Sequence, residues 1–277
     1  MRIAMAQVST GTDPHANLEI VAARTREAAG SGAELVVFPE ATMCRFGVPL
    51  APIAEPLDGP WASRVRAIAE EAGTTVVVGM FTPADTASGR ARVTNTLLVA
   101  GPDGASTSYD KIHLYDAYGF RESDTVAAGS TPTTISVGGH TVGLATCYDI
   151  RFPELFTTLA ADGAEIVVVP ASWGAGPGKR RQWRVLAQAR ALDSSTVIAA
   201  VGQAVPTDPA VAESSAPTGI GNSVLVDPFG ELVAEYGEVE HLGVHDVDLD
   251  RVEAARSAIG VLANRRLAPA RAGVVTA

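Results

Sequence analysis

Hydrophobic residues follow two patterns along this chain, and each pattern predicts a different kind of element. Short apolar runs rich in β-branched residues predict strands at residues 3–8, 35–38, 75–81, 93–100, 105–112, 133–137, 141–145, 165–170, 196–202, 223–226, 232–236 and 244–247. Apolar residues spaced three or four apart predict helices at residues 17–29, 61–72, 153–162 and 180–192, with a short helix near Arg251. Turns at residues 101–104 and 138–139 join two pairs of strands as hairpins.

Hairpins and strand–helix–strand units occur together in this chain, which predicts an α/β fold with mixed sheets. The strand at 165–170 is apolar on both faces, so we expect two stacked sheets with helices outside. No linker or shift in composition divides the chain, and we predict a single domain over residues 1–277. Residues 204–221, rich in Pro, Ala, Ser and Thr, are predicted to form a loop. The tail at about 268–277 lacks periodicity and is expected to be loose or to extend onto a partner subunit.

Composition and charge narrow the class of protein. The 277 residues are 47% hydrophobic, which is enough for a large core. The net charge is −10 without a long basic run, which disfavours nucleic acid or an anionic membrane as a partner. The two cysteines indicate a reducing compartment rather than a disulfide framework. The N-terminus is typical of a strand rather than a signal peptide, and no apolar run is long enough to span a membrane. We therefore expect a cytoplasmic protein.

Cys147 lies at the turn between the strand at 141–145 and the helix at 153–162. Backbone N–H groups and the positive end of a helix dipole both favour thiolate at such a turn, and the thiolate is the nucleophile. Free cysteines are also often inert, buried packing residues. This segment alone is compatible with both interpretations.

Two further reactive residues follow predicted strands. Glu40 comes just after the strand at 35–38, and Lys111 lies near the end of the strand at 105–112. Sites in α/β architectures gather at the ends of strands. A nucleophile (Cys147), a carboxylate base and a cation together form a set suited to amide chemistry.

Three short motifs carry a resemblance to a known family. Phe-Pro-Glu at 38–40, Asp-Lys-Ile-His-Leu at 110–114 and Cys-Tyr-Asp-Ile-Arg-Phe-Pro-Glu at 147–154 resemble the signatures of the carbon–nitrogen hydrolase family, also called the nitrilase superfamily. The three reactive residues are separated by 71 and 36 positions, which suits that family. Nearly the whole chain is similar, with further matching segments at 121–123, 182–191, 222–230 and 264–266.

The resemblance implies a four-layer αββα sandwich with two mixed sheets, assembled as a homodimer or larger, without a metal or other cofactor. It implies that Cys147 attacks the substrate carbon to form a thioester and that Glu40 is the general base. Lys111, helped by the backbone N–H of Tyr148, is implied to stabilise the oxyanion. Glu122 is implied to support Lys111 or to position the substrate. A buried glutamate beside a thiol and an ammonium can exchange a proton without leaving an unpaired charge.

The residues after the cysteine are most similar to the Nit-type amidases, which include omega-amidases and deaminated-glutathione amidase. Substrates of that kind carry carboxylates, and we hypothesise that Arg151, or a basic residue at 179–181, binds the carboxylate. The alternative for Arg151 is a salt bridge to Glu154. Trp173 is expected to line the pocket, with core packing as its alternative.

Other candidate residues have simpler interpretations. Cys44 is interpreted as a small packed residue and His113 as a hydrogen-bonding neighbour of the site rather than a base. Asn222 departs from the histidine that is common in relatives. Two other hydrolase activities stay open, a carbamoylase and a nitrilase, as does a non-catalytic binding protein. The complete set of Glu40, Lys111 and Cys147 argues against the last of these.

Overall fold

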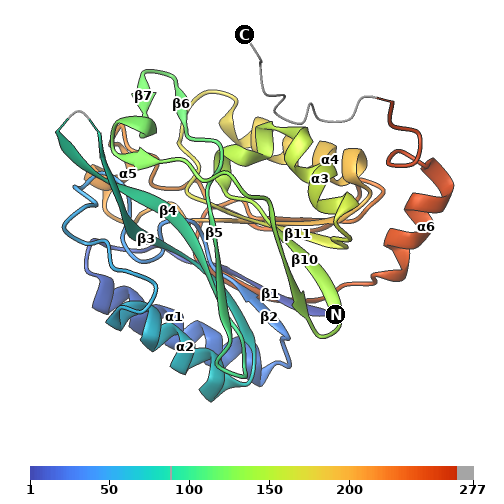
Figure 1. Cartoon of the computed structure of the whole chain (residues 1–277), viewed down its shortest axis with the longest axis horizontal. Helices are drawn as coiled ribbons and strands as arrows, with labels where there is room; N and C mark the ends of the chain where they lie inside the picture. Colours follow the sequence, from blue (N-terminus) through green and yellow to red (C-terminus); the bar gives the residue numbers. More distant parts are fainter. Residues whose placement is uncertain (88, 267–277) are drawn as a thin grey trace, which may run out of the picture.

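Two β-sheets lie face to face, and helices cover the outer face of each sheet (Figure 1). The computed structural model describes residues 1–87 and 89–266. Within these ranges, the first sheet has the strand order β15 (His241–Asp246), β1 (Arg2–Gln7), β2 (Leu35–Val37), β3 (Thr75–Ala87), β4 (Arg90–Ala100) and β5 (Ser106–Asp110), with β8 (Val126–Ala127) beside β4. The second sheet, in the same described ranges, has the order β14 (Leu232–Glu235), β13 (Val224–Val226), β12 (Val197–Gly202), β11 (Ile166–Ala171), β10 (His140–Leu144) and β9 (Thr133–Val137).

Both sheets are mixed, as the sequence predicted. In the first sheet, β1, β2 and β3 run parallel, and β15, β4 and β5 pair antiparallel with their neighbours. In the second sheet, β10, β11 and β12 run parallel, and β9, β13 and β14 are antiparallel. The parallel strands therefore lie at the centre of each sheet, with their carboxyl ends on one side.

Four main helices form the two outer layers. In Figure 1, α1 (Pro14–Gly30) and α2 (Pro60–Ala72) lie below the first sheet, and α3 (Pro153–Ala161) and α4 (Lys179–Ser194) lie above the second. The side chain of Asp13 caps α1 by accepting a hydrogen bond from the backbone N–H of His15, and a proline follows at the first position. This cap explains why α1 begins three residues before the predicted start at residue 17.

Successive side chains along each strand point to opposite faces of its sheet, and this divides the core into layers. In β1, Ile3 and Met5 belong to the core between the sheets, whereas Ala4 and Ala6 belong to the core under α1 and α2. In β11, Ile166 and Val168 likewise face the first sheet. Their neighbours Val167 and Val169 pack against α3 and α4. Both faces of these strands are apolar because each face packs against another layer. The predicted four-layer αββα sandwich is confirmed.

The structure differs from the predicted elements in several places, among them β3, which extends to Ala87 instead of residue 81, and β15, which begins at His241 instead of residue 244. Residues 116–127 hold two short strands, β6 (Asp116–Ala117) and β7 (Phe120–Arg121), then the 3-10 helix η1 (Glu122–Asp124) and β8, none of which was predicted. These pieces are two or three residues long, too short for a hydrophobic period to show. The predicted loop at 204–221 contains a short helix, α5 (Pro209–Ala212). β5 ends at Asp110 rather than at residue 112.

The remaining helix, α6 (Asp250–Ile259), matches the short helix predicted near Arg251. No helix in residues 1–87 or 89–266 has both the length and the apolar composition needed to cross a membrane. The predicted tail at 268–277 lies outside the described residues.

Candidate active site

The ends of three strands bring the predicted reactive residues together. Glu40 follows β2, Lys111 follows β5, and Cys147 follows β10 at the start of the 3-10 helix η2 (Cys147–Arg151). Glu122, the first residue of η1, lies beside these residues. It comes from the segment at 116–127, where the sequence predicted no helix or strand. All four side chains are buried, and they line one pocket.

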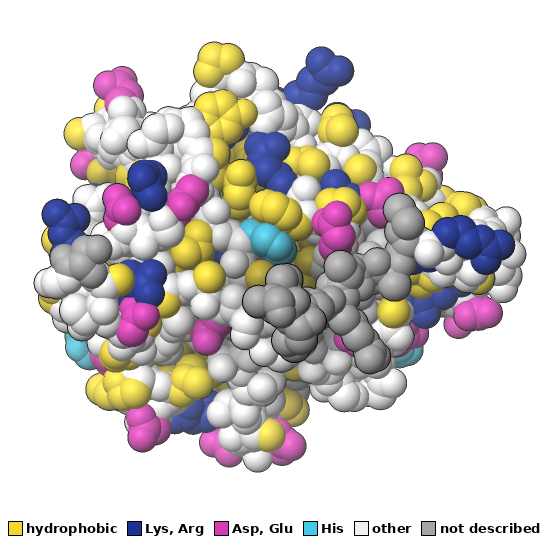
Figure 2. All heavy atoms as spheres, turned by 45° about the horizontal axis from the view of Figure 1, so that its top comes forward, with side chains coloured by type: hydrophobic (Ala, Val, Ile, Leu, Met, Phe, Trp, Pro, Cys, Tyr) yellow, Lys and Arg dark blue, Asp and Glu magenta, His cyan; other side chains and the backbone are white. Residues whose placement is uncertain are grey.

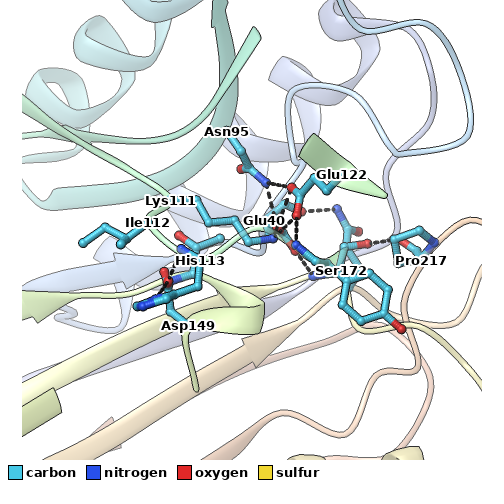
Figure 3. A network of polar contacts seen from close by, with 12 residues as sticks. Glu40, Asn95, Lys111, Ile112, His113, Glu122, Asp149, Ser172 and Pro217 are labelled. Atoms are coloured by element: carbon cyan, nitrogen blue, oxygen red, sulfur yellow. Dashed lines mark hydrogen bonds and ion pairs between the residues drawn. The ribbon is translucent and has the colours of Figure 1, made fainter. Parts of the chain in front are cut away.

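Lys111 is the centre of a buried ion-pair cluster (Figure 3). Its ammonium, on a side chain only 2% exposed, lies 2.9 Å from Glu40 Oε1 and 2.9 Å from Glu122 Oε2. Asn95, from β4, donates its amide to both carboxylates, at 2.8 Å to Glu40 and 3.1 Å to Glu122. The backbone N–H of Tyr115 donates to Glu122 Oε2 at 2.7 Å. The two carboxylates are therefore held on either side of one cation.

Glu40 is fixed by backbone contacts on its other side. The backbone N–H of Ser172, just after β11, donates to Glu40 Oε2 at 2.8 Å. Gly79 in β3 lies directly behind the turn that carries Glu40, where an added Cβ would stand 2.6 Å from the backbone nitrogen of Ala41. Ala41 itself has a φ of +58°, a strained value for a residue with a side chain. The close approach at Gly79 therefore permits the sharp turn that aims Glu40 into the pocket.

A buried aspartate fixes the turn that carries Cys147. Asp149 accepts hydrogen bonds from the backbone N–H groups of Thr146 at 2.8 Å and His113 at 2.9 Å, and from the hydroxyl of Tyr109 at 2.6 Å. Its Oδ1 also lies 2.8 Å from His113 Nδ1. Asp149 thus ties the turn that carries Cys147 to the segment around Lys111. His113 contacts this aspartate, as expected of a neighbouring hydrogen bonder.

Cys147 itself adopts a left-handed backbone with a φ of +47°, which is strained for a non-glycine residue. Burial raises the pKa of its thiol well above the ordinary value, and the charge of Glu40 raises it further, while Lys111 lowers it. The direction of this pKa shift is opposite to the expectation that the turn favours thiolate, and burial is its largest cause. The resting side chain is a thiol that needs a base.

Lys111 stays charged in this environment. Burial alone lowers the pKa of its ammonium, but the attraction of Glu122 and of Glu40 outweighs burial and raises the pKa well above the ordinary value. Cys44, the other cysteine, is fully buried, and burial raises the pKa of its thiol to about 11. It is a packed residue, as interpreted from the sequence.

The pocket above Cys147 encloses about 370 Å³, including its open mouth. Its lining residues, from both sheets and the connecting loops, are Glu40, Phe46, Lys111, Tyr115, Phe120, Glu122, Cys147, Tyr148, Ser172, Trp173, Gly174, Lys179 and Pro217. Tyr148 and Trp173 are therefore among the residues that line the pocket.

Arg151 does not line this pocket. Its guanidinium donates to Gln182 Oε1 at 2.7 Å and lies over the ring of Trp173 at 5.2 Å, so it supports the pocket wall from behind. The anticipated salt bridge to Glu154 is not among the ion pairs of the described residues. In segment 179–181, Lys179 is buried and reaches the pocket, whereas Arg180 and Arg181 are exposed.

Three polar groups of the site were not identified from the sequence. Asn95 had a detectable signal, because it is an amide in a predicted strand whose other residues are β-branched or apolar. Asp149 and Ser172 had none, since their roles depend on contacts with segments distant in sequence. In residues 1–87 and 89–266, no group of three or more His, Cys, Asp or Glu side chains is arranged to hold a metal ion.

Comparison with known proteins places this geometry in a family. A carbon–nitrogen hydrolase family model matches residues 2–257. Hydrolase Rv0480c of Mycobacterium tuberculosis is 56% identical over 271 residues, covering 96% of this chain and 95% of the relative. The deaminated glutathione amidase of Escherichia coli O157:H7 is 35% identical over 273 residues, covering 97% of this chain and 98% of the relative.

A solved structure gives the same result. A variant of the amidase from Nesterenkonia sp. AN1 matches with a TM-score of 0.77 at 27% identity, covering 96% of this chain and 94% of that chain. In that structure, the acetamide moiety of fluoroacetamide is covalently added to the active-site cysteine. The present chain therefore belongs to the carbon–nitrogen hydrolase family.

Proposed function

We propose that this protein is an amidase that hydrolyses a small amide through a thioester on Cys147 and releases ammonia. One observation carries the proposal: the buried cluster of Glu40, Lys111 and Glu122 lies in the pocket that holds Cys147. The cluster supplies a base and a fixed cation beside a nucleophile that is otherwise protonated.

The first half-reaction forms the thioester. Cys147 Sγ bonds to the amide carbon while Glu40 takes the thiol proton, so that the negative charge moves to the carbonyl oxygen. Lys111 and the backbone N–H of Tyr148 stabilise this oxyanion. Glu40 then gives the proton to the departing nitrogen, the C–N bond breaks, and ammonia leaves. An oxyanion donor of this kind lowers the barrier by about 3 kcal/mol, or about a hundredfold in rate.

The second half-reaction releases the acid. Glu40 takes a proton from a water molecule, whose oxygen attacks the thioester carbon, and the C–S bond breaks. The proton returns to sulfur, which restores the thiol. The raised pKa of Cys147 favours this last step, because a poorly stabilised thiolate takes up a proton readily. Glu122 acts through Lys111, which it holds in place with two contacts from its carboxylate.

The proposed substrate is a small acidic amide, with the amide at the end of the molecule remote from the carboxylate. The relative named deaminated glutathione amidase supports this class. A pocket narrowed by the side chains of Tyr115, Phe120 and Trp173 suits a small molecule rather than a protein substrate. An N-carbamoyl amino acid or a nitrile uses the same nucleophile, and the products distinguish them, because a carbamoyl substrate releases CO₂ with ammonia.

The test is ammonia release from a panel that contains 2-oxoglutaramate, a simple aliphatic amide, an N-carbamoyl amino acid and a nitrile. Wild-type protein is compared with Cys147→Ala and with Cys44→Ala as a matched control. The proposal predicts turnover of the acidic amide that is lost in Cys147→Ala and kept in Cys44→Ala. Full activity in Cys147→Ala would refute it.

We also propose that the chain works in the cytoplasm as a homodimer or larger assembly. Two large hydrophobic side chains of α4, Val185 and Leu192, are exposed on the outer layer. Burial of such surface between subunits is favourable. Light scattering after size-exclusion chromatography measures the assembly, and a monomer at micromolar concentration would contradict this proposal.

A further inference from the structure

A second lysine lines the active-site pocket, and it differs from Lys111 in having no carboxylate partner. Lys179, the first residue of α4, is only 7% exposed. Its ammonium donates to the hydroxyl of Tyr115 at 3.0 Å and lies 3.9 Å from the centre of the Tyr118 ring. Within the described part of the chain, it forms no ion pair. Lysine is rarely buried without a partner, since a desolvated charge is costly unless it is compensated.

The pocket therefore has two ends of different charge. At the end that holds Cys147, Lys111 is compensated by Glu40 and Glu122, so this cluster carries a net charge of −1 when all three are ionised. At the other end, the ammonium of Lys179 contacts the Tyr115 hydroxyl and aromatic rings, and no carboxylate of the described residues pairs with it. The start of α4 adds a positive helix dipole there. An anionic group is thus favoured at one end of the pocket and disfavoured at the other.

Tyr115 joins the two ends. Its backbone N–H donates to Glu122 at 2.7 Å, and its hydroxyl accepts from Lys179 at 3.0 Å. Glu122 and Lys179 therefore bond to the two ends of one tyrosine residue. A molecule that reaches both needs only a short carbon chain between its amide and its anion.

The walls between the two ends are apolar and aromatic. Tyr115, Phe120 and Trp173 line the pocket, and Tyr118 covers Lys179 from outside. The face that carries β6, β7 and the start of α4 comes forward in Figure 2, where hydrophobic side chains lie next to Lys and Arg side chains. Such walls suit the methylene groups of a short chain.

We propose that Lys179 binds the carboxylate of an acidic amide and so sets the preference of this pocket for anionic over neutral amides. This inference rests on the proposed amidase function. It makes Lys179 the residue that determines specificity and leaves Arg151 as a support of the wall, because the guanidinium of Arg151 already bonds to Gln182 outside the pocket. The carboxylate replaces no protein partner and supplies the counter-charge that Lys179 lacks.

The experiment compares a charged amide with its neutral isostere, glutaramate with glutaramide, on wild-type protein and Lys179→Met. Methionine keeps the length and apolar stem of lysine without its charge. We expect kcat/KM for glutaramate to fall about 10- to 100-fold, the usual range for losing a hydrogen bond to a charged group. The loss is expected in KM, since the contact is present in both ground and transition states. For glutaramide, kcat/KM stays within about threefold.

Two further variants control for structure and charge. Arg181→Met removes the same charge from an exposed position on the same helix and is expected to leave both substrates unchanged. Lys179→Arg keeps the charge and is expected to restore part of the preference for glutaramate. Equal losses on both substrates in Lys179→Met would mean that Lys179 only supports the fold, and unchanged kinetics would mean that it binds no anion. Either result overturns the proposal.

A second measurement does not depend on turnover. Glutarate, which has no amide to hydrolyse, is expected to slow the alkylation of Cys147 by iodoacetamide in wild-type protein, and to do so at least tenfold more weakly in Lys179→Met. If glutarate protects Cys147 but no amide is hydrolysed, the amidase function fails while the anion site stands. If amides are hydrolysed but glutarate gives no protection in wild-type protein, the anion site fails while the amidase function stands.

Discussion

Replacing Lys111 by methionine removes the cation from the buried cluster while keeping most of its volume. Glu40 keeps its contacts from Asn95 and Ser172, and Glu122 keeps those from Asn95 and Tyr115. The carboxylates therefore stay hydrogen-bonded, but the net charge of the cluster changes from −1 to −2 when both are ionised. The variant thus isolates the contribution of charge.

The expected loss of stability is large because the side chains of Glu40, Lys111 and Glu122 are almost fully buried. Removing one partner of a buried ion pair costs about 3–5 kcal/mol. A typical domain has a free energy of unfolding of about 5–15 kcal/mol, so the variant should still fold. Activity should fall as well, by about 100- to 1,000-fold in kcat, since the oxyanion loses its cation.

Urea unfolding, followed by tryptophan fluorescence at a fixed protein concentration, measures the stability, and ammonia release measures kcat. The double variant Lys111→Met/Glu122→Gln provides the matched comparison. Its cluster again carries a net charge of −1, so it should recover about 1–3 kcal/mol of the lost stability. Its activity should stay as low as that of Lys111→Met. A loss of less than about 1 kcal/mol in Lys111→Met, with no recovery in the double variant, would refute the electrostatic reasoning.

Three further variants test other parts of the site. Gly79→Ala should lower kcat at least tenfold, because its Cβ would stand 2.6 Å from the Ala41 nitrogen and displace the Glu40 turn, whereas Gly30→Ala, with nothing within 4 Å, should be neutral in the ammonia assay. Asp149→Ala should lower the unfolding free energy by about 2–4 kcal/mol in urea, since it leaves several buried donors unpaired. In Lys111→Met, the pKa of Cys147 should rise further, because Lys111 lowers it in the wild type; the pH profile of iodoacetamide alkylation, followed by intact mass, should shift to higher pH.

Each of these expectations has a clear contrary outcome. Equal kcat values for the variants at Gly79 and Gly30 would show that the turn at Glu40 tolerates a shift. Wild-type stability in Asp149→Ala would show that its hydrogen bonds are replaced by water. An alkylation profile in Lys111→Met that moves to lower pH would contradict the sign of the interaction between Lys111 and the thiol.

The sequence predicted the layered architecture and three residues of the candidate site for identifiable reasons. Apolar runs on both faces of the central strands are a direct consequence of the sheet-on-sheet core. Glu40, Lys111 and Cys147 each follow a strand, so their convergence follows from the topology of the sheets. The family motifs identified the same three residues, and the comparisons confirm the family.

The remaining features depend on contacts that no local pattern encodes. The direction of the Cys147 pKa shift was misjudged because burial and the charge of Glu40, which raise this pKa, are not visible in the local turn. Lys179 was one of several basic residues in its segment, and only the fold shows that it is buried without a carboxylate while Arg180 is exposed. Asp149 stabilises the nucleophile's turn through His113, 36 positions away.

The most direct test of Cys147 as the nucleophile is the mass of the protein during turnover. Wild-type protein is mixed with an acidic amide, quenched with acid within one turnover and analysed by intact and peptide mass spectrometry. We expect an added acyl group on Cys147 and one ammonia released per adduct. Neither signal is expected in Cys147→Ala. Turnover by Cys147→Ala, or an acyl group on another residue, would contradict the assignment of Cys147 as the nucleophile.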